Sequence, residues 1–182
     1  MGRTKRIWHP DEYYHVYIRG NRKEGLFRQA TDYDYFLEIV ERAHKRSPVE
    51  VTSFCLMKTH YHLQIRSKQN SISDVMKYIN RVYALYYNHK YRLRGPVFLT
   101  RFSSKAITDQ RSMLHVSRYI HQNPVSANIT PLPEKYKWSS YSYYLNQSNP
   151  SPPSFLTLTP VLDSFSGSTD QKIQKYIEWC QY

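Results

Sequence analysis

Apolar and polar residues follow two periods along the chain, which predicts a mixture of strands and helices. Apolar residues at every second position are typical of half-buried strands, whereas a spacing of three or four residues is typical of amphipathic helices. Turn and capping residues between the segments give their boundaries. The predicted strands are residues 13–20, 49–57, 60–67 and 96–107, and the predicted helices are residues 31–46, 71–95 and 108–124.

Capping residues and prolines locate the ends of the helices. A short polar side chain before an apolar-periodic segment is the usual N-cap. The expected N-caps are Thr31 or Asp32 for the first helix, Ser71 or Ser73 for the second, and Thr108 or Asp109 for the third. Pro124 is expected to end the third helix, because proline lacks the N–H that a helix interior needs.

The order strand, helix, strand, strand, helix, strand predicts an α+β fold. A ferredoxin-like, four-stranded antiparallel sheet with both helices on one face satisfies this order with short connections. The other face would be open, with the third helix beside it. These elements place a first domain at residues 1–145.

Residues 146–182 are predicted to be a linker followed by a helical tail. The segment 146–160 is rich in proline and serine, which predicts a linker or extended arm that takes no part in the sheet. An amphipathic helix follows at 171–180 and needs a partner, because so short a helix is marginal in water. Two positions for this helix are possible. It could dock near the open face, or it could lie far from that face and act only as a stabilising cap.

Two histidines begin the second arm of the predicted hairpin, after the two-residue turn Lys58-Thr59. Alternation along a strand puts His60 and His62 on one face, while Tyr61 and its apolar neighbours face the core. Two imidazoles on a rigid strand can hold a divalent metal, although the set needs a further donor. On its own, such a pair more often serves packing and hydrogen bonding.

Tyr119 and Asn123 lie four residues apart on the predicted third helix and therefore share one face. On its own, a tyrosine on a helix flank is commonly a packing residue. His121 points away from Tyr119 around the helix and is interpreted as structural.

Composition favours a polyanionic partner, and a generic basic surface or a ribosome-associated protein is the alternative. The 26 Lys and Arg outweigh the 14 Asp and Glu, for a formal net charge of +12, and 18 tyrosines are present. Cations follow a phosphate backbone while aromatic rings stack on unpaired bases, so this mixture suits single-stranded nucleic acid. No segment reaches membrane-spanning length, and the two distant cysteines form no disulfide framework, so a cytoplasmic protein is expected.

Several segments in order resemble the HUH single-tyrosine transposases and, within them, the REP-associated tyrosine transposases of bacteria. The resemblance covers about residues 13–145 and rests on the segments YHVYIRGN, LMKTHYHLQI, GPVFLTRF, SRYIHQNPV and KWSSYSYYL. Lys58-Thr59 stands where the family usually has Pro-Asn. The resemblance implies the predicted βαββαβ fold with a catalytic open face.

The resemblance also implies a set of functional residues. His60 and His62 would bind Mg²⁺ or Mn²⁺ with Asn123 as third ligand, and Tyr119 would be the nucleophile. Tyrosine is a weak nucleophile at neutral pH and needs orientation by a nearby metal or base. Its attack on DNA would leave a 5′-phosphotyrosine. From their own chemistry rather than from the resemblance, the candidate DNA contacts are Arg19, Asn21, Arg101, Lys105 and Arg118, each of which also fits solvated surface charge.

The implied function is a metal-dependent, single-strand DNA endonuclease and strand transferase. Its partners would be single-stranded or hairpin DNA of repetitive extragenic palindromes, and its location the bacterial nucleoid. The REP-associated branch implies a monomer, whereas related insertion-sequence transposases exchange tyrosine helices within a dimer. A regulatory hairpin-binding module without turnover and a phosphodiesterase that uses water are the alternatives.

Overall fold

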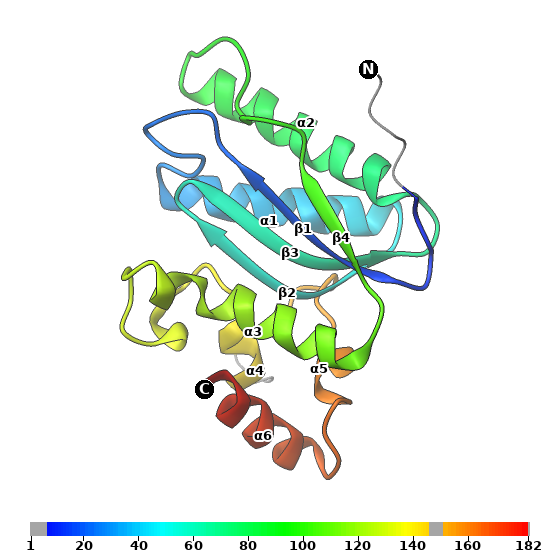
Figure 1. Ribbon diagram of the computed structural model, residues 1–182. Helices are drawn as coiled ribbons and strands as arrows, with labels where there is room; N and C mark the ends of the chain where they lie inside the picture. The colour runs from blue at the N-terminus through cyan, green and yellow to red at the C-terminus, as the bar shows by residue number, and fades with distance from the viewer. Residues whose placement is uncertain (1–6, 146–150, 182) are drawn as a thin grey trace.

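The computed structural model of the chain describes residues 7–145 and 151–181. Four strands form one antiparallel sheet in the order β2-β3-β1-β4 (Figure 1). The strands are β1 (Tyr13–Arg19), β2 (Val49–Met57), β3 (His60–Ser67) and β4 (Ser103–Ile107). The helices are α1 (Ala30–Arg46), α2 (Ile72–Lys90), α3 (Gln110–Ser126), α4 (Tyr141–Leu145), α5 (Thr159–Leu162) and α6 (Thr169–Gln181), with a short 3₁₀ helix η1 (Pro133–Lys135). This order confirms the predicted α+β fold.

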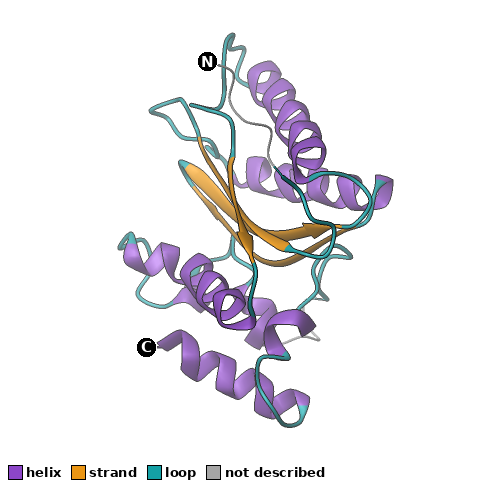
Figure 2. Cartoon of the chain, turned by 45° about the vertical axis from the view of Figure 1, so that its right-hand side comes forward, coloured by secondary structure: helices purple, strands orange, loops and turns teal. Residues whose placement is uncertain are grey.

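The helices lie in layers on both sides of the sheet. Helices α1 and α2 cover one face, and α3 lies across the other, with α4, α5 and α6 beyond it (Figures 1 and 2). Helix α3 packs against β2 and β3, so it leaves the β1 and β4 side of this face uncovered. The face expected to be open is therefore only half open.

The main core lies between the sheet and helices α1 and α2. Alternate residues of β3, namely Tyr61, Leu63 and Ile65, are buried on this side, as the strand pattern predicts. Each buried apolar side chain of this size stabilises the fold by about 1.5–3 kcal/mol. The helices contribute Phe36, Ile39, Val40, Met76, Ile79 and Tyr83.

Helix α1 begins earlier than its polar residues suggest. Its N-cap is Gln29, so the expectation of Thr31 or Asp32 is wrong. Asp32 is instead fully buried one turn inside, where its carboxylate accepts hydrogen bonds from Lys90 Nζ at 2.6 Å and Tyr91 Oη at 2.6 Å. Burial alone raises the pKa of this carboxyl, but these bonds and those from the N–H groups at the cap outweigh it and lower the pKa.

Helix α2 keeps its predicted cap but ends early. The Ser71 side chain accepts a hydrogen bond from the N–H of Asp74. The helix ends at Lys90 rather than at residue 95, and Arg92 has a positive φ of 52°. A residue in this left-handed region cannot continue a right-handed helix.

Helix α3 keeps its N-cap but continues through its proline. The Asp109 side chain accepts a hydrogen bond from the Ser112 N–H at 2.8 Å. The helix runs on to Ser126, so the expectation that Pro124 ends it is wrong. Because Pro124 lies in the last turn, its missing N–H removes only one helical hydrogen bond. Its own carbonyl accepts from the N–H of Ile129 at 2.9 Å.

Strand β4 is shorter than predicted. It begins at Ser103, and residues 96–102 form a connection from α2. This connection still pairs with the end of β1, because the N–H of Leu99 donates to the Arg19 carbonyl at 3.0 Å and the N–H of Asn21 donates to the Val97 carbonyl at 2.8 Å. The prediction of a strand from residue 96 is therefore wrong in length, although part of the segment extends the sheet.

The described part of the predicted linker is packed on the domain. Residues 146–150 lie outside the described residues, but Phe155, Leu156 and Leu158 are buried in the main core. Leu156 forms an isolated parallel bridge with Val51, and the N–H of Val51 donates to the Phe155 carbonyl at 2.8 Å. The expectation that this segment takes no part in the sheet is wrong here, because its apolar residues outweigh its prolines.

Helix α6 packs on α3 from the side away from the sheet (Figure 2). Tyr176 is fully buried, and its hydroxyl contacts Ser117 Oγ at 2.5 Å and His121 Nδ1 at 2.7 Å. The other ring nitrogen of His121 contacts Ser140 Oγ at 2.7 Å. The tail thus anchors the helix that carries Tyr119, and its position fits a stabilising cap.

Replacing Tyr176 by Phe is expected to lower the free energy of unfolding by about 1–3 kcal/mol, because two buried polar groups on α3 lose a partner. Urea denaturation measures the difference. Tyr143→Phe on α4 is the matched control and should be nearly neutral, because the Tyr143 hydroxyl makes no hydrogen bond within the described residues. Equal losses in both variants would contradict this role for Tyr176.

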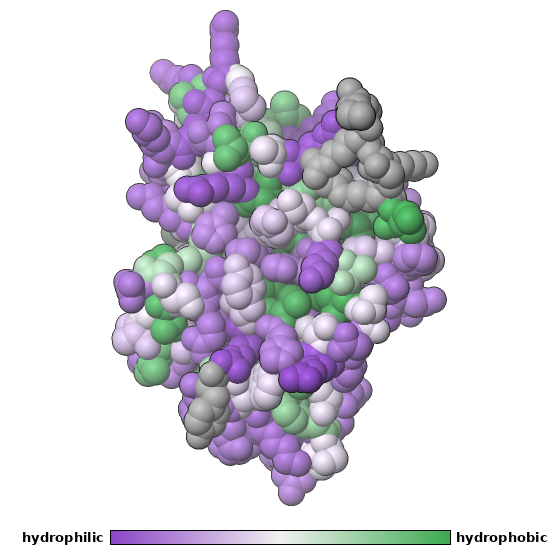
Figure 3. Space-filling view, viewed as in Figure 1, coloured by the Kyte–Doolittle hydropathy of each residue, from purple (hydrophilic) through white to green (hydrophobic). Residues whose placement is uncertain are grey.

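Within residues 7–145 and 151–181, no helix combines the length and apolar character that crossing a membrane requires. Polar side chains dominate the face seen in the space-filling view, and apolar side chains gather only in small patches (Figure 3).

Candidate active site

The histidine pair lies where the hairpin places it, at the start of β3 on the face opposite α1 and α2. His62 is 5% exposed and His60 is half-buried. Their ring centroids are 5.1 Å apart. The turn before them is fixed by the segment after β1, since the N–H of Leu26 donates to the Lys58 carbonyl at 2.7 Å. Gly25 permits this approach, because a Cβ there would meet that carbonyl oxygen at 2.8 Å.

Helix α3 brings Tyr119 over the histidines. The Tyr119 ring lies edge-on to the His62 ring, with centroids 5.4 Å apart. The side chain is 53% exposed, so its hydroxyl is open to a substrate. The helix is held by Ile120, which packs on Cys55 and Met57 of β2, and by a contact of 2.6 Å between Ser117 Oγ and Ser53 Oγ. The structure therefore joins the two motifs that are 57 or more residues apart in sequence.

Asn123 completes the group on the next turn of α3. Its side-chain Nδ2 donates to the Tyr119 carbonyl at 2.7 Å, so Oδ1 is the atom of this side chain that can accept a hydrogen bond or bind a metal. Asn123 acts toward His60 as a hydrogen-bond acceptor that raises the pKa of the imidazole. The predicted set of His60, His62, Tyr119 and Asn123 is thus brought together.

A third histidine, which the sequence analysis missed, lies beside the pair. His15 is on β1, and its Nε2 is 3.0 Å from Nδ1 of His62. The alternation of residues 13–20 puts His15 on one face, but the pairing of β1 with β3 decides which face that is. The His15 ring is also 5.7 Å from the Tyr119 ring.

The contacts of the predicted ligand side chains decide which of their atoms a metal could use. Nδ1 of His62 is engaged by His15, and Nδ1 of His60 contacts Thr59 Oγ1 at 3.0 Å. Nε2 of His62 is therefore left, whereas a bound metal would have to replace the hydrogen bond between the His60 and Asn123 side chains. Within the described ranges, no group of three or more His, Cys, Asp or Glu can hold a metal ion. A metal here would consequently depend on the Asn123 oxygen, and the donor set suits a divalent ion with open positions.

All three imidazoles are held in the neutral form. Burial lowers the pKa of His62 to about 3, with the nearby His15 and His60 acting in the same direction. Burial and then the charge of Lys105 lower the pKa of His15 to about 4. Burial also lowers the pKa of His60, and it outweighs the opposing effect of the hydrogen bond that the imidazole donates to Asn123. A neutral imidazole is the form that binds a metal.

The five predicted DNA contacts are not all at this site. Arg19 and Lys105 lie on the same face as the histidines, opposite His60 and His15 in the strand register. Asn21 follows β1 in the turn that pairs with residue 97. Arg101 instead borders a hollow between β1 and α2. The Arg118 guanidinium lies 5.6 Å from the ring of Trp179 on α6, so it packs against the tail.

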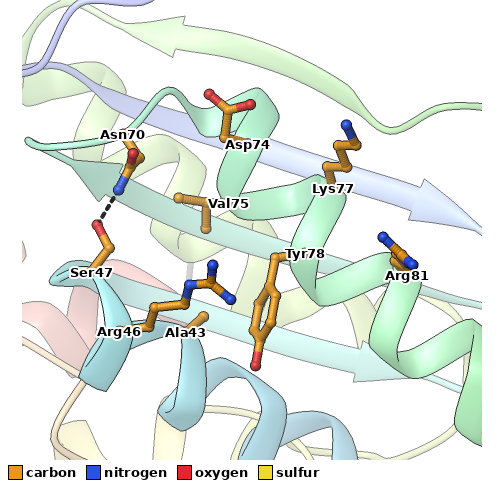
Figure 4. Close-up of a pocket in the computed structure, with 9 residues that line it drawn as sticks. All are labelled: Ala43, Arg46, Ser47, Asn70, Asp74, Val75, Lys77, Tyr78 and Arg81. Atoms are coloured by element: carbon orange, nitrogen blue, oxygen red, sulfur yellow. Dashed lines mark hydrogen bonds between the residues drawn. The ribbon is translucent and has the colours of Figure 1, made fainter.

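A separate cavity of about 310 Å³ lies between α1 and α2, on the other face of the sheet (Figure 4). None of the candidate catalytic residues lines it. Its lining residues are Ala43, Arg46, Ser47, Asn70, Asp74, Val75, Lys77, Tyr78 and Arg81.

The sequence model of a family described as "Transposase IS200 like" matches residues 10–123, more than half of the chain. The match begins three residues before β1 and ends at Asn123, so it includes the histidines and Tyr119. The chain therefore belongs to the IS200-like transposases. Among curated proteins, no sequence matches this one.

Solved structures of transposases are similar to this chain. The structure of a REP-associated tyrosine transposase bound to a REP hairpin has a TM-score of 0.69 and 14% sequence identity, and the alignment covers 93% of each chain. At this identity the likeness establishes the shared fold. A structure described as "a putative transposase from Deinococcus radiodurans" has a TM-score of 0.43 and 15% identity, over 67% of this chain and 95% of that chain.

Proposed function

We propose that this chain is a metal-dependent, single-strand DNA endonuclease and strand transferase that acts at palindromic hairpins through Tyr119. The observation that carries the proposal is the exposed Tyr119 ring, 5.4 Å from the ring of a buried, neutral histidine. Membership of the transposase family supports strand transfer as the reaction class. The hairpin bound in the similar structure supports hairpin DNA as the substrate.

His60, His62 and Asn123 would hold Mg²⁺ or Mn²⁺. When bound, such an ion polarises the scissile phosphate and stabilises the charge that develops on it. His15 orients His62 through their 3.0 Å contact, so that Nε2 points to the ligand position. Arg19 and Lys105 flank the histidines and would neutralise neighbouring phosphates of the strand.

Tyr119 acts as the nucleophile in this proposal. A bond forms between its hydroxyl oxygen and phosphorus, the bond from phosphorus to the 3′ oxygen breaks, and that oxygen leaves as a 3′-hydroxyl. The 5′ end stays on the enzyme as a phosphotyrosine. A second 3′-hydroxyl then reverses the step on another strand, so joining consumes no nucleotide cofactor.

A covalent trap tests the proposed function. The protein is incubated with Mn²⁺ or Mg²⁺ and a palindromic DNA hairpin with a single-stranded flank, labelled at its 3′ end. We expect the label to migrate with the protein on a denaturing gel, because the 5′-phosphate side remains attached to Tyr119. A perfect duplex of the same sequence should give no adduct.

The other outcomes separate the alternatives. Cleavage without an adduct would favour a phosphodiesterase that uses water. Hairpin binding without cleavage would favour the regulatory module. Equal cleavage of the perfect duplex would contradict a single-strand enzyme.

A further inference from the structure

Tyr17 is an exposed aromatic residue in the middle of the sheet. It lies on β1, between β3 and β4, and is 46% exposed. Its strand neighbours on this face are His15 and Arg19. Among the described residues its hydroxyl makes no hydrogen bond, so no polar partner explains its position.

The surroundings of Tyr17 leave its ring accessible from the β4 side. In the strand register, Tyr17 is opposite His62 on β3 and opposite Ser103 on β4. Its ring is stacked toward the His62 ring, with centroids 5.9 Å apart and planes at 30°. The small Ser103 side chain does not cover the ring on the other side. Helix α3 packs on β2 and β3, so it does not cover the ring either.

Tyr17 and Tyr119 border the same histidine from two sides. The Tyr119 ring is 5.4 Å from His62, and the Tyr17 ring is 5.9 Å from it. A phosphate held beside His62 and attacked by Tyr119 therefore has its neighbouring nucleoside near Tyr17. Lys105 and Arg19, on the same face, are placed to contact the backbone on either side.

We propose that Tyr17 is a stacking platform for the unpaired nucleobase next to the scissile phosphate. The proposal rests on the function proposed above and names the part of the substrate that this position recognises. Bases of single-stranded DNA stack on exposed aromatic rings, and every base offers a flat face for this contact. Duplex DNA keeps its bases stacked on one another, so the platform also favours unpaired DNA over duplex.

Binding measurements with two DNA probes test the proposal. The probes are a DNA stem–loop with a short single-stranded thymidine tail and the same stem–loop without the tail. Fluorescence anisotropy without divalent metal measures affinity and avoids cleavage. Tyr17→Ala should weaken binding of the tailed probe by roughly 10- to 100-fold. It should leave the untailed probe unchanged, and Tyr17→Phe should bind both probes like the wild type.

An abasic scan locates the stacked base. Replacing each tail nucleotide in turn by an abasic site should weaken wild-type binding at one position, by about the same factor as Tyr17→Ala. At that position, the abasic site should cost the Tyr17→Ala protein nothing further, because the two changes remove one contact. Tyr78→Ala, at the cavity on the opposite face (Figure 4), is the matched control and should leave both affinities unchanged.

Two results would overturn the assignment. A Tyr17→Ala variant that loses affinity equally for both probes, or one that loses further affinity at every abasic position, would show that Tyr17 does not stack on a flank base. The covalent trap would still be positive in both cases, and a positive trap therefore distinguishes a failure of the Tyr17 proposal from a failure of the proposed function. A wild-type protein that binds neither probe would overturn both proposals.

Discussion

Tyr119→Phe is expected to abolish the covalent protein–DNA adduct and to lower strand cleavage by a factor on the order of 10⁴ or more. The substitution removes only the hydroxyl oxygen that attacks phosphorus in the proposed reaction. Single-turnover cleavage of a labelled hairpin with a single-stranded flank measures the loss. Folding should be unaffected, because the side chain is 53% exposed and its hydroxyl has no partner among the described residues.

The matched control is Tyr78→Phe, which removes a hydroxyl from the opposite face and should cleave at the wild-type rate. The affinity of Tyr119→Phe for the uncleaved hairpin should also stay near the wild-type value, because phosphate contacts dominate binding. An adduct that persists in Tyr119→Phe would place the nucleophile elsewhere among the 18 tyrosines.

His60→Ala is expected to abolish the proposed metal-dependent cleavage of DNA. The variant loses one of the three proposed donors, and its metal affinity should fall by about 100-fold or more. Calorimetric titration with Mn²⁺ measures this affinity without reference to activity. His60 is the better choice than His62, because His62 is almost fully buried and its removal would also leave a cavity.

His89→Ala, an exposed histidine near the end of α2, is the control for the loss of an imidazole. It should bind Mn²⁺ and cleave DNA like the wild type. Hairpin affinity in the absence of metal should be close to wild type in both variants. Normal cleavage by His60→Ala at ordinary metal concentration would contradict the assignment of this residue as a ligand.

Much of the fold follows from local pattern. The hairpin of β2 and β3 is predicted because alternation fixes the faces and Lys58-Thr59 fixes the turn. The ends of elements are less predictable, because tertiary contacts decide them. Asp32 is a typical cap by residue type, yet it is buried inside the helix. There it accepts hydrogen bonds from Lys90 and Tyr91, which follow it by nearly 60 residues.

The candidate site is predictable in its residues but not in its full set of neighbours. The histidine pair and the spacing of Tyr119 and Asn123 can be recognised along the chain. The contact of His15 with His62 depends on strand order and register, which separate segments do not reveal. The packing of Arg118 on Trp179 depends likewise on where the tail docks. These pairings are set by the whole core rather than by either segment alone.

Helix α3 is attached to the sheet of its own chain, and this attachment affects how the cleavage rate should depend on protein concentration. Ser117 joins this helix to β2 and also to Tyr176 of the tail. One polypeptide therefore supplies the histidines and the tyrosine together. If the chain acts as the monomer that its family resemblance implies, the rate of the first cut in the proposed reaction should rise in direct proportion to protein concentration, without a threshold for assembly. A cell that makes only a few copies would then retain the full activity of each.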